Sequence, residues 1–236
     1  MTIETNGASP SPAGAGQPGP RKRIGVFGGT FDPVHNGHLH IAREVRRALA
    51  LDRIIWVPAG KPPHKRGQIV SDDRDRVAMI ELALAAAPRD KVSTIELERP
   101  GPSYTADTLE TLAQDLAPAE LVFIMGEDSL RDFPTWKDPE RILAVAELAV
   151  AGRPGIDTDV DDLVQQLPEL EHRVTLVPMA ELQVSSSEIR RRVAEGEPIA
   201  DLVPAAVAEY IAREGLYRKA GTLAPTPLPV RRERGC

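Results

Sequence analysis

Two histidines, His35 and His38, stand between a glycine-rich stretch and a segment with the apolar spacing of a helix. A short apolar run at residues 24–27 precedes Gly28 and Gly29, so the sequence predicts a strand, a glycine turn and then a helix. Glycines allow backbone N–H groups to approach an anion closely, and the N-terminus of a helix adds positive potential. Histidines placed there can stabilise charge on phosphorus during group transfer. The arrangement is therefore suited to a triphosphate.

Other interpretations of the histidine pair can be weighed from the sequence. His40 lies close by and suggests a metal site, but a closed zinc site needs four good ligands, and the only cysteine, Cys236, is the last residue. The Gly-x-Gly-x-x-Gly fingerprint of dinucleotide-binding domains is absent, and so is a Walker A lysine. The histidines can also be simple polar residues at a helix start. We favour the phosphate interpretation and expect no metal held by protein side chains.

A second phosphate-binding element is predicted far downstream. Ser185 and Glu188 have the spacing of a capping box, which marks the start of a helix. A capped helix start is also an anion site, and Ser186 and Arg190 are four residues apart, so they can share a face. Arginine can bind phosphate through two N–H groups. This stretch can therefore face the histidines across a triphosphate.

A cationic loop is expected at residues 58–70, where Lys61, His64, Lys65 and Arg66 stand among prolines. Two interpretations stay open. The loop can be a solvated surface segment, or it can be an arm that closes over a phosphate and balances its charge.

Several of these stretches resemble a known family. The sequence GGTFDPVHNGH at residues 28–38 resembles the GxxFDxxHxGH signature of the nucleotidylyltransferase superfamily. Its GGTFDP residues are most similar to those of the bacterial nicotinate-nucleotide adenylyltransferases. Further similarities to that family are PSYTADTL (102–109), IMGEDSL (124–130) followed by Trp136, AGRPG (151–155) and VSSSEIR (184–190). Ser187 stands where the family usually has threonine. The resemblance runs from about Arg23 to Tyr217.

The resemblance implies roles for individual residues. His35, His38 and Arg190 would be catalytic. The residues expected to bind ATP are Gly28, Gly29, Thr30, Phe31, His35, His38, Gly126, Asp128, Arg153, Ser186 and Arg190. Those expected to bind the mononucleotide are Lys65, Tyr104, Thr105 and Trp136. These assignments agree with the chemistry, because a pyridine ring needs a flat apolar partner such as Trp136, and a carboxylate needs N–H donors such as those of the turn at Thr105.

The implied activity is transfer of AMP from ATP to nicotinate mononucleotide, which gives deamido-NAD and pyrophosphate for NAD biosynthesis, with Mg²⁺ assisting. The acceptor phosphate is already ionised, so the reaction needs positioning and charge stabilisation rather than a nucleophilic side chain. Two alternatives remain. The acceptor can be nicotinamide mononucleotide, or the chain can be a catalytically silent nucleotide-binding regulator on the same fold.

Composition limits the class of protein. The 236 residues are 42% hydrophobic and 27% charged, as in a globular protein, and the net charge of −6 argues against a general nucleic-acid binder. No apolar run reaches transmembrane length, so we expect no membrane partner. A single terminal cysteine favours the cytoplasm. A homo-oligomer is neither indicated nor excluded.

The fold predicted from the pattern is α/β: a Rossmann-like, doubly wound parallel sheet with flanking helices and a C-terminal helical portion. The expected strands are 23–27, 53–57, 92–97, 121–125, 148–151 and 174–177. The expected helices are 37–50, 72–86, 105–116, 139–146, 160–167, 186–195 and 204–213. Residues 1–20 are expected to form a disordered tail, 21–220 the domain and 221–236 a flexible tail. Ligands of such sheets bind outside the carboxyl ends of the strands.

Overall fold

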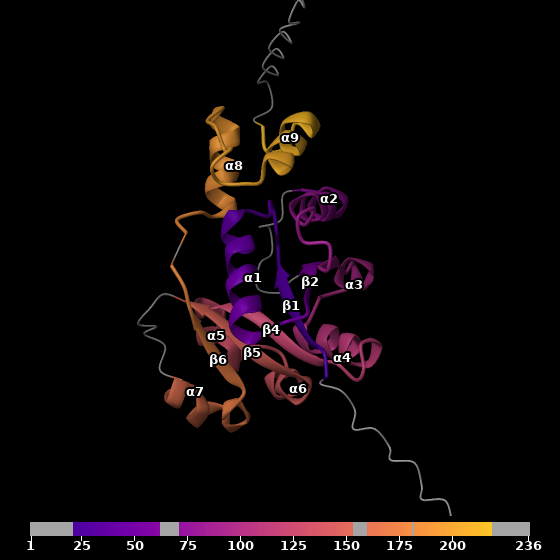
Figure 1. The fold of residues 1–236 in the computed structure, drawn as a ribbon, viewed down its shortest axis with the longest axis vertical. Coiled ribbons are helices and arrows are strands. Elements are labelled where there is room, and N and C mark those ends of the chain that lie inside the picture. Colours follow the sequence, from indigo (N-terminus) through magenta and orange to yellow (C-terminus); the bar gives the residue numbers. More distant parts are fainter. Residues whose placement is uncertain (1–20, 62–70, 153–159, 181, 219–236) are drawn as a thin grey trace, which may run out of the picture.

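The computed structural model describes residues 21–61, 71–152, 160–180 and 182–218 (Figure 1). The predicted tails at 1–20 and 221–236 lie outside these residues. The elements in chain order are β1 (Arg23–Gly29), α1 (Asn36–Leu49), β2 (Arg53–Pro58), α2 (Asp73–Ala83), β3 (Lys91–Val92), α3 (Ile95–Glu98), α4 (Thr105–Asp115), β4 (Glu120–Gly126), α5 (Glu127–Asp132), the 3₁₀ turn η1 (Phe133–Thr135), α6 (Pro139–Val145), β5 (Ala146–Gly152), α7 (Val160–Gln166), the 3₁₀ turn η2 (Pro168–Leu170), β6 (Val174–Pro178), α8 (Ser186–Glu195) and α9 (Ala205–Glu214).

The strands form one six-stranded sheet in the order β3-β2-β1-β4-β5-β6, and every neighbouring pair is parallel. Val26 of β1 pairs with Ile55 on one side and with Phe123 of β4 on the other. The strand order reverses between β1 and β4, which makes that point the topological switch of a doubly wound sheet. The predicted Rossmann-like fold is confirmed.

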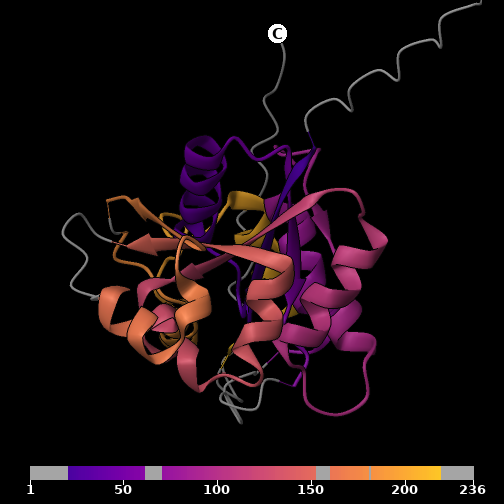
Figure 2. The same cartoon turned by 90° about the horizontal axis from the view of Figure 1, so that it is seen from below.

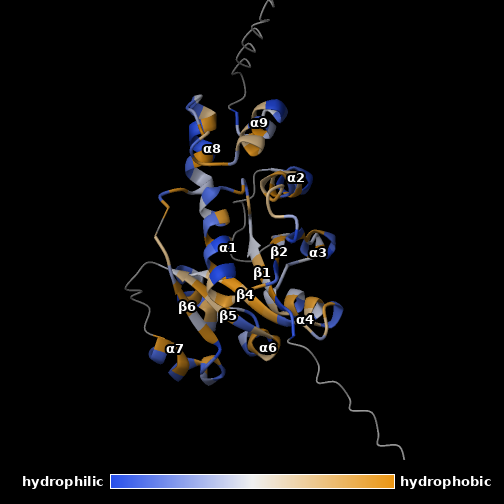
Figure 3. Cartoon of the chain, viewed as in Figure 1, coloured by the Kyte–Doolittle hydropathy of each residue, from blue (hydrophilic) through white to orange (hydrophobic). Residues whose placement is uncertain are grey.

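Helices cover both faces of the sheet, as the turned view shows (Figure 2). On one face, apolar residues of α1, α2, α8 and α9 pack with Trp56 and Ile124. On the other, α4, α5, α6 and α7 pack with Val26 and Phe123. The strands are apolar and the exposed helix faces polar (Figure 3), because a parallel strand is buried on both faces.

The strand expected at residues 92–97 is wrong for most of its length. Pairing with β2 ends at Val92, and Ile95–Glu98 forms the helical turn α3. Backbone N–H groups of Leu97 and Glu98 donate to the carbonyl of Thr94, and the Thr94 hydroxyl donates to the Glu98 carboxylate at 2.5 Å. An apolar run this short fits either structure by periodicity alone, and the tertiary contacts decide.

The predicted C-terminal helical portion is confirmed by α8 and α9, which lie at one end of the molecule (Figure 1). The connection between them reaches the start of α1, where the Asn36 N–H donates to the Leu202 carbonyl at 2.9 Å. Helix α9 packs on α2, and the Tyr210 hydroxyl donates to the Asp75 carboxylate at 2.8 Å.

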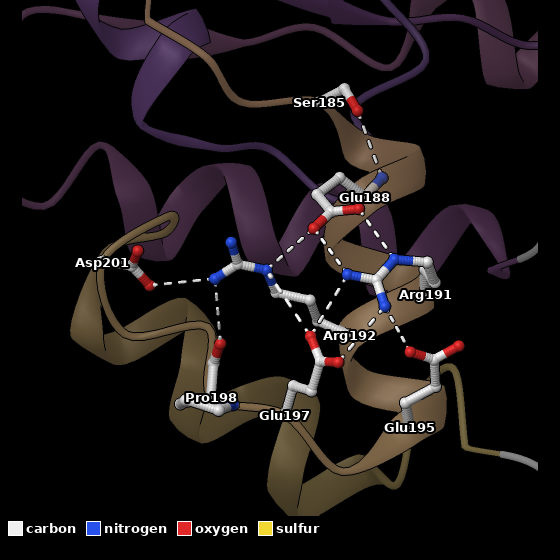
Figure 4. Close-up of polar contacts among 8 residues, drawn as sticks. All are labelled: Ser185, Glu188, Arg191, Arg192, Glu195, Glu197, Pro198 and Asp201. Carbon is white, nitrogen blue, oxygen red and sulfur yellow. Dashed lines mark hydrogen bonds and ion pairs between the residues drawn. The ribbon is translucent and has the colours of Figure 1, made fainter.

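The outer face of α8 carries a network of ion pairs (Figure 4). Arg191 pairs with Glu188, Glu195 and Glu197, and Arg192 shares Glu188 at 2.9 Å. The side chain of Arg191 is 46% exposed, so solvent screens these pairs and they contribute little to stability.

Among the described residues, no helix combines the length and apolar character needed to span a membrane.

Candidate active site

A cavity of about 800 Å³ lies at the carboxyl ends of β1 and β4, the switch point of the sheet. The predicted residues that line it are Gly28, Gly29, Thr30, His35, His38, Tyr104, Thr105, Gly126, Asp128 and Trp136. These residues come from five separate stretches of the sequence, and the fold brings them around one space large enough for a nucleotide.

The glycines do not form the expected turn. Gly28 and Gly29 are the last two residues of β1, and neither has a positive φ. Gly29 is required for space, since a Cβ there would lie 2.9 Å from the ring of Phe31, whereas a Cβ on Gly28 would make an ordinary contact with Phe123 at 3.5 Å. The left-handed position belongs to Phe31 itself, with φ 49, which is uncommon for a residue with a side chain and persists because the ring is buried.

The histidines cap helix α1. His35 is the N-cap and His38 occupies the third position of the helix, and their rings stack with centroids 3.7 Å apart. The backbone N–H of each donates to Nδ1 of the other at 3.3 Å. A nitrogen that accepts a hydrogen bond carries no proton, so each neutral ring has its proton on Nε2. The pair is thus both a helix start and part of the cavity wall.

Burial decides the charge of His35. The side chain is 7% exposed, and desolvation lowers the pKa of His35 to about 4. The ring is therefore neutral at pH 7 and offers a hydrogen-bond donor rather than a charge, with the helix N-terminus adding positive potential.

This lowered pKa predicts a pH-dependent stability. The unfolded chain binds a proton near pH 6.5 but the folded chain only near pH 4, so stability is fully present above pH 6.5 and falls as the pH drops to 4. The expected loss is roughly 3 kcal/mol, because one pKa unit corresponds to about 1.4 kcal/mol. Urea unfolding at pH 7 and pH 4.5 measures it.

The matched variant is His35→Asn, because asparagine is a good N-cap and does not titrate. Its unfolding free energy should depend less on pH across this window than that of the wild type. Equal pH dependence in the two proteins would rule out a buried neutral His35.

The Phe31 ring supports His38 from behind. It lies 4.9 Å from the His38 ring in an edge-on arrangement and is 1% exposed. Phe31 is therefore placed behind the cavity wall, in contact with a histidine rather than at the cavity surface. Its predicted role toward ATP would be exerted through His38.

Ser186 and Arg190 share one face of α8, as predicted, and they contact the loop between β1 and α1. The Ser186 hydroxyl donates to the Pro33 carbonyl at 2.9 Å, and the Arg190 guanidinium donates to the Asp32 carbonyl at 2.6 Å. Ser185 caps the helix by accepting from the Glu188 N–H at 3.2 Å. Both residues lie beside the histidine loop, just outside the set that lines the cavity.

Aromatic residues form another part of the cavity wall. The Trp136 ring packs edge-on against Phe123 at 6.1 Å and is only partly buried, so one face adjoins the cavity. Thr105 is the first residue of α4 and Tyr104 its N-cap. Tyr104 makes no side-chain capping bond, so the first N–H groups of α4 lack a capping acceptor within the described chain.

The remaining predicted residues differ in where they lie and what they contact. Gly126 ends β4 and has open space where a Cβ would be, while the Asp128 side chain is 96% exposed beside it. Lys65 and Arg153 lie outside the described residues. His40, considered above as a metal ligand, has one ring nitrogen 3.1 Å from the Ala180 carbonyl and the other 2.8 Å from Arg43.

No group of three or more metal-ligating side chains occurs in the ranges that the structure describes.

Two polar cavity residues that the sequence did not single out are Glu96 and Lys137. Glu96 lies in the predicted strand 92–97, but its partly buried carboxylate accepts from Thr108 at 3.0 Å and from the Gly60 N–H at 3.4 Å, and desolvation raises the pKa of Glu96. Lys137 lines the cavity beside Trp136 and pairs with Asp138 at 3.0 Å. The sequence offers two signals for them: Glu96 is an acid within a predicted strand, and Lys137 is a cation next to the predicted stacking ring.

A doubly wound sheet with a histidine-capped helix start at its switch point defines a nucleotidyltransferase. The family model described as Cytidylyltransferase-like matches residues 26–192. A protein of Thermomicrobium roseum named "Probable nicotinate-nucleotide adenylyltransferase" is 49% identical over 207 residues, which cover 88% of this chain and 97% of the relative. One of the same name from a Roseiflexus species is 47% identical over 83% of this chain and 98% of its own length. The chain belongs to the nicotinate-nucleotide adenylyltransferase family.

Solved structures agree on the fold. The nicotinic acid mononucleotide adenylyltransferase of Plasmodium falciparum, complexed with NaAD, superposes with a TM-score of 0.67 at 20% identity, covering 84% of this chain and 98% of that one. At that identity the likeness extends to the fold alone.

Proposed function

We propose that this protein transfers the adenylyl group of ATP to nicotinate mononucleotide, forming deamido-NAD and releasing pyrophosphate in NAD biosynthesis. The observation that carries the proposal is the cavity of about 800 Å³, whose wall includes both a helix N-terminus with two histidines and the ring of Trp136. The histidines at the helix start suit a triphosphate, and Trp136 suits a pyridine ring. The relatives named above support the same activity.

The mechanism follows from positioning and electrostatics. A phosphate oxygen of the mononucleotide attacks the α-phosphorus of ATP, the bond to the β-phosphate oxygen breaks, and pyrophosphate leaves. The Nε2–H groups of His35 and His38 would donate to phosphate oxygens as negative charge grows on them. Stacking holds the two rings in fixed orientation before substrate binds, so little reorganisation is needed during the reaction.

Mg²⁺ is proposed to enter with the ATP phosphates rather than to occupy a resident site. Such ions are commonly held by substrate phosphates, waters and one or two carboxylates. Of the described residues, the carboxylates that line the cavity are Glu96, Glu127, Asp128 and Asp132, and one or two of them could contribute. The ion would neutralise part of the phosphate charge.

Recognition of the acceptor would use the aromatic part of the cavity wall. Trp136 offers a face for the pyridine ring, and the uncapped N–H groups at the start of α4 can bind a carboxylate. Thr105 and Tyr104 would supply part of this contact. We place the reaction in the cytoplasm, where NAD precursors and ATP are available.

The test is to measure pyrophosphate release with nicotinate mononucleotide and with nicotinamide mononucleotide. We expect kcat/KM to favour the nicotinate form by about 10- to 100-fold, because a hydrogen bond to a charged group contributes about 1.5–3 kcal/mol. A preference for the amide would assign the alternative acceptor. ATP binding without pyrophosphate release would indicate a silent regulator instead.

A further inference from the structure

Asp32, in the loop between β1 and α1, is a fully buried acid that the mechanism above does not use. Its carboxylate accepts a hydrogen bond from the Tyr217 hydroxyl at 2.6 Å and another from the backbone N–H of Ser71 at 3.2 Å. A buried carboxylate is costly unless it is hydrogen-bonded, so these contacts fix its position.

The backbone carbonyls of the same loop are also held by side chains. Arg190 donates to the Asp32 carbonyl at 2.6 Å and Ser186 to the Pro33 carbonyl at 2.9 Å, both from α8. Arg76 of α2, which is fully buried, donates to the Thr30 carbonyl at 2.9 Å. The loop that leads to His35 is therefore held from several sides, and Tyr217 holds it through the Asp32 side chain.

Tyr217 reaches Asp32 by an unusual backbone path. Helix α9 ends at Gly215, with φ 66, and the chain then places Tyr217 itself at φ 63. A left-handed φ is unfavourable for a residue with a Cβ and persists where the surroundings require it. The contact that this conformation permits is the hydrogen bond to Asp32. Burial, and then that hydrogen bond, raise the pKa of Tyr217, so the hydroxyl keeps its proton and remains the donor.

We propose that Tyr217 is a positioning residue for adenylyl transfer, whose hydroxyl fixes Asp32 and thereby the loop that presents His35 and His38 to the triphosphate. The proposal rests on the proposed function. Tyr217 is not one of the residues that line the cavity, so it acts through Asp32 rather than on the substrate. Asp32 lies three residues before the N-cap His35, and a small shift of the loop moves both rings.

The test compares two tyrosine-to-phenylalanine variants. Tyr217→Phe removes the hydroxyl that contacts Asp32. Tyr210→Phe removes one from the same C-terminal region that contacts Asp75 of α2, away from the loop. We expect Tyr217→Phe to lower kcat by about 10-fold, because misplaced catalytic groups lose part of the benefit of fixed orientation. The KM for the mononucleotide should stay unchanged, and Tyr210→Phe should keep the wild-type kcat. Equal kcat values for the two variants would overturn the proposal.

A second readout does not depend on activity. The NMR signals of the His35 and His38 rings should shift in Tyr217→Phe and stay in place in Tyr210→Phe. If the wild type releases no pyrophosphate, the proposed function fails, while the ring signals still test whether Tyr217 positions the histidines. Unchanged ring signals in Tyr217→Phe would refute that role.

The Tyr217 hydroxyl and the Asp32 carboxylate should also act as one unit. Asp32→Asn is expected to lower kcat, and adding Tyr217→Phe to it should lower kcat by much less than the 10-fold that Tyr217→Phe costs alone, since the shared hydrogen bond is already altered. Fully additive effects in this double-mutant cycle would show that Tyr217 acts independently of Asp32.

Discussion

Replacing His38 by alanine is expected to lower kcat by about 10²–10⁴ while the protein stays folded, the range expected for losing a donor to the transition state. The His38 ring lines the cavity and stacks on His35, so its loss removes one phosphate donor and loosens the other. The substitution also removes the acceptor for the His35 N–H, which should cost about 1 kcal/mol of stability as other helix caps do. That cost is too small to unfold a domain of this size.

The measurement is pyrophosphate release at saturating ATP and mononucleotide, together with a thermal melt. His172→Ala is the matched control, because His172 is 91% exposed and adjoins η2, far along the chain from α1. It should retain wild-type kcat. A near-wild-type rate for His38→Ala would remove His38 from the reaction.

The sequence predicted the residues around the cavity better than it predicted how each one acts. Strand–loop–helix order and the spacing of His35 and His38 place both rings at a helix start, and local geometry then makes them stack. The mutual capping could not be read from the spacing, because it depends on which ring nitrogen faces the backbone. Capping and phosphate binding are compatible in this structure. Each backbone N–H donates to Nδ1 of the other histidine, which leaves the proton of each neutral ring on Nε2.

Side-chain contacts that form only in the folded chain explain the remaining differences. Gly29 is required by the ring of Phe31 packed against it, and Glu96 turns from strand into α3 because Thr108 and Gly60 bind its carboxylate. Thr108 and Gly60 lie 12 and 36 residues from Glu96, so local propensity does not reveal these contacts. The role of Tyr217 is of the same kind, since 185 residues separate it from Asp32.

Replacing Arg190 by alanine is the second change with a large expected effect. We expect kcat/KM for ATP to fall by about 10²–10³, as when a donor to developing charge is removed. The guanidinium donates to the Asp32 carbonyl at 2.6 Å and to the Ser187 hydroxyl at 3.3 Å, so its loss frees the loop before His35 and removes a positive charge beside that loop. The kcat/KM of Arg190→Lys for ATP should lie between those of the wild type and Arg190→Ala, because lysine keeps the charge but lacks the planar fork that makes both contacts.

Arg191 provides the control, one residue along the same helix. Its guanidinium faces Glu188, Glu195 and Glu197 on the outer surface of α8 (Figure 4), where solvent screens the pairs. Arg191→Ala removes the same formal charge from α8 but leaves the Asp32 carbonyl with its donor. If the overall positive charge of α8 were what bound ATP, both variants would lose kcat/KM equally. If the contact with the loop is decisive, only Arg190→Ala loses it, and steady-state kinetics with ATP varied at saturating mononucleotide separates the two cases.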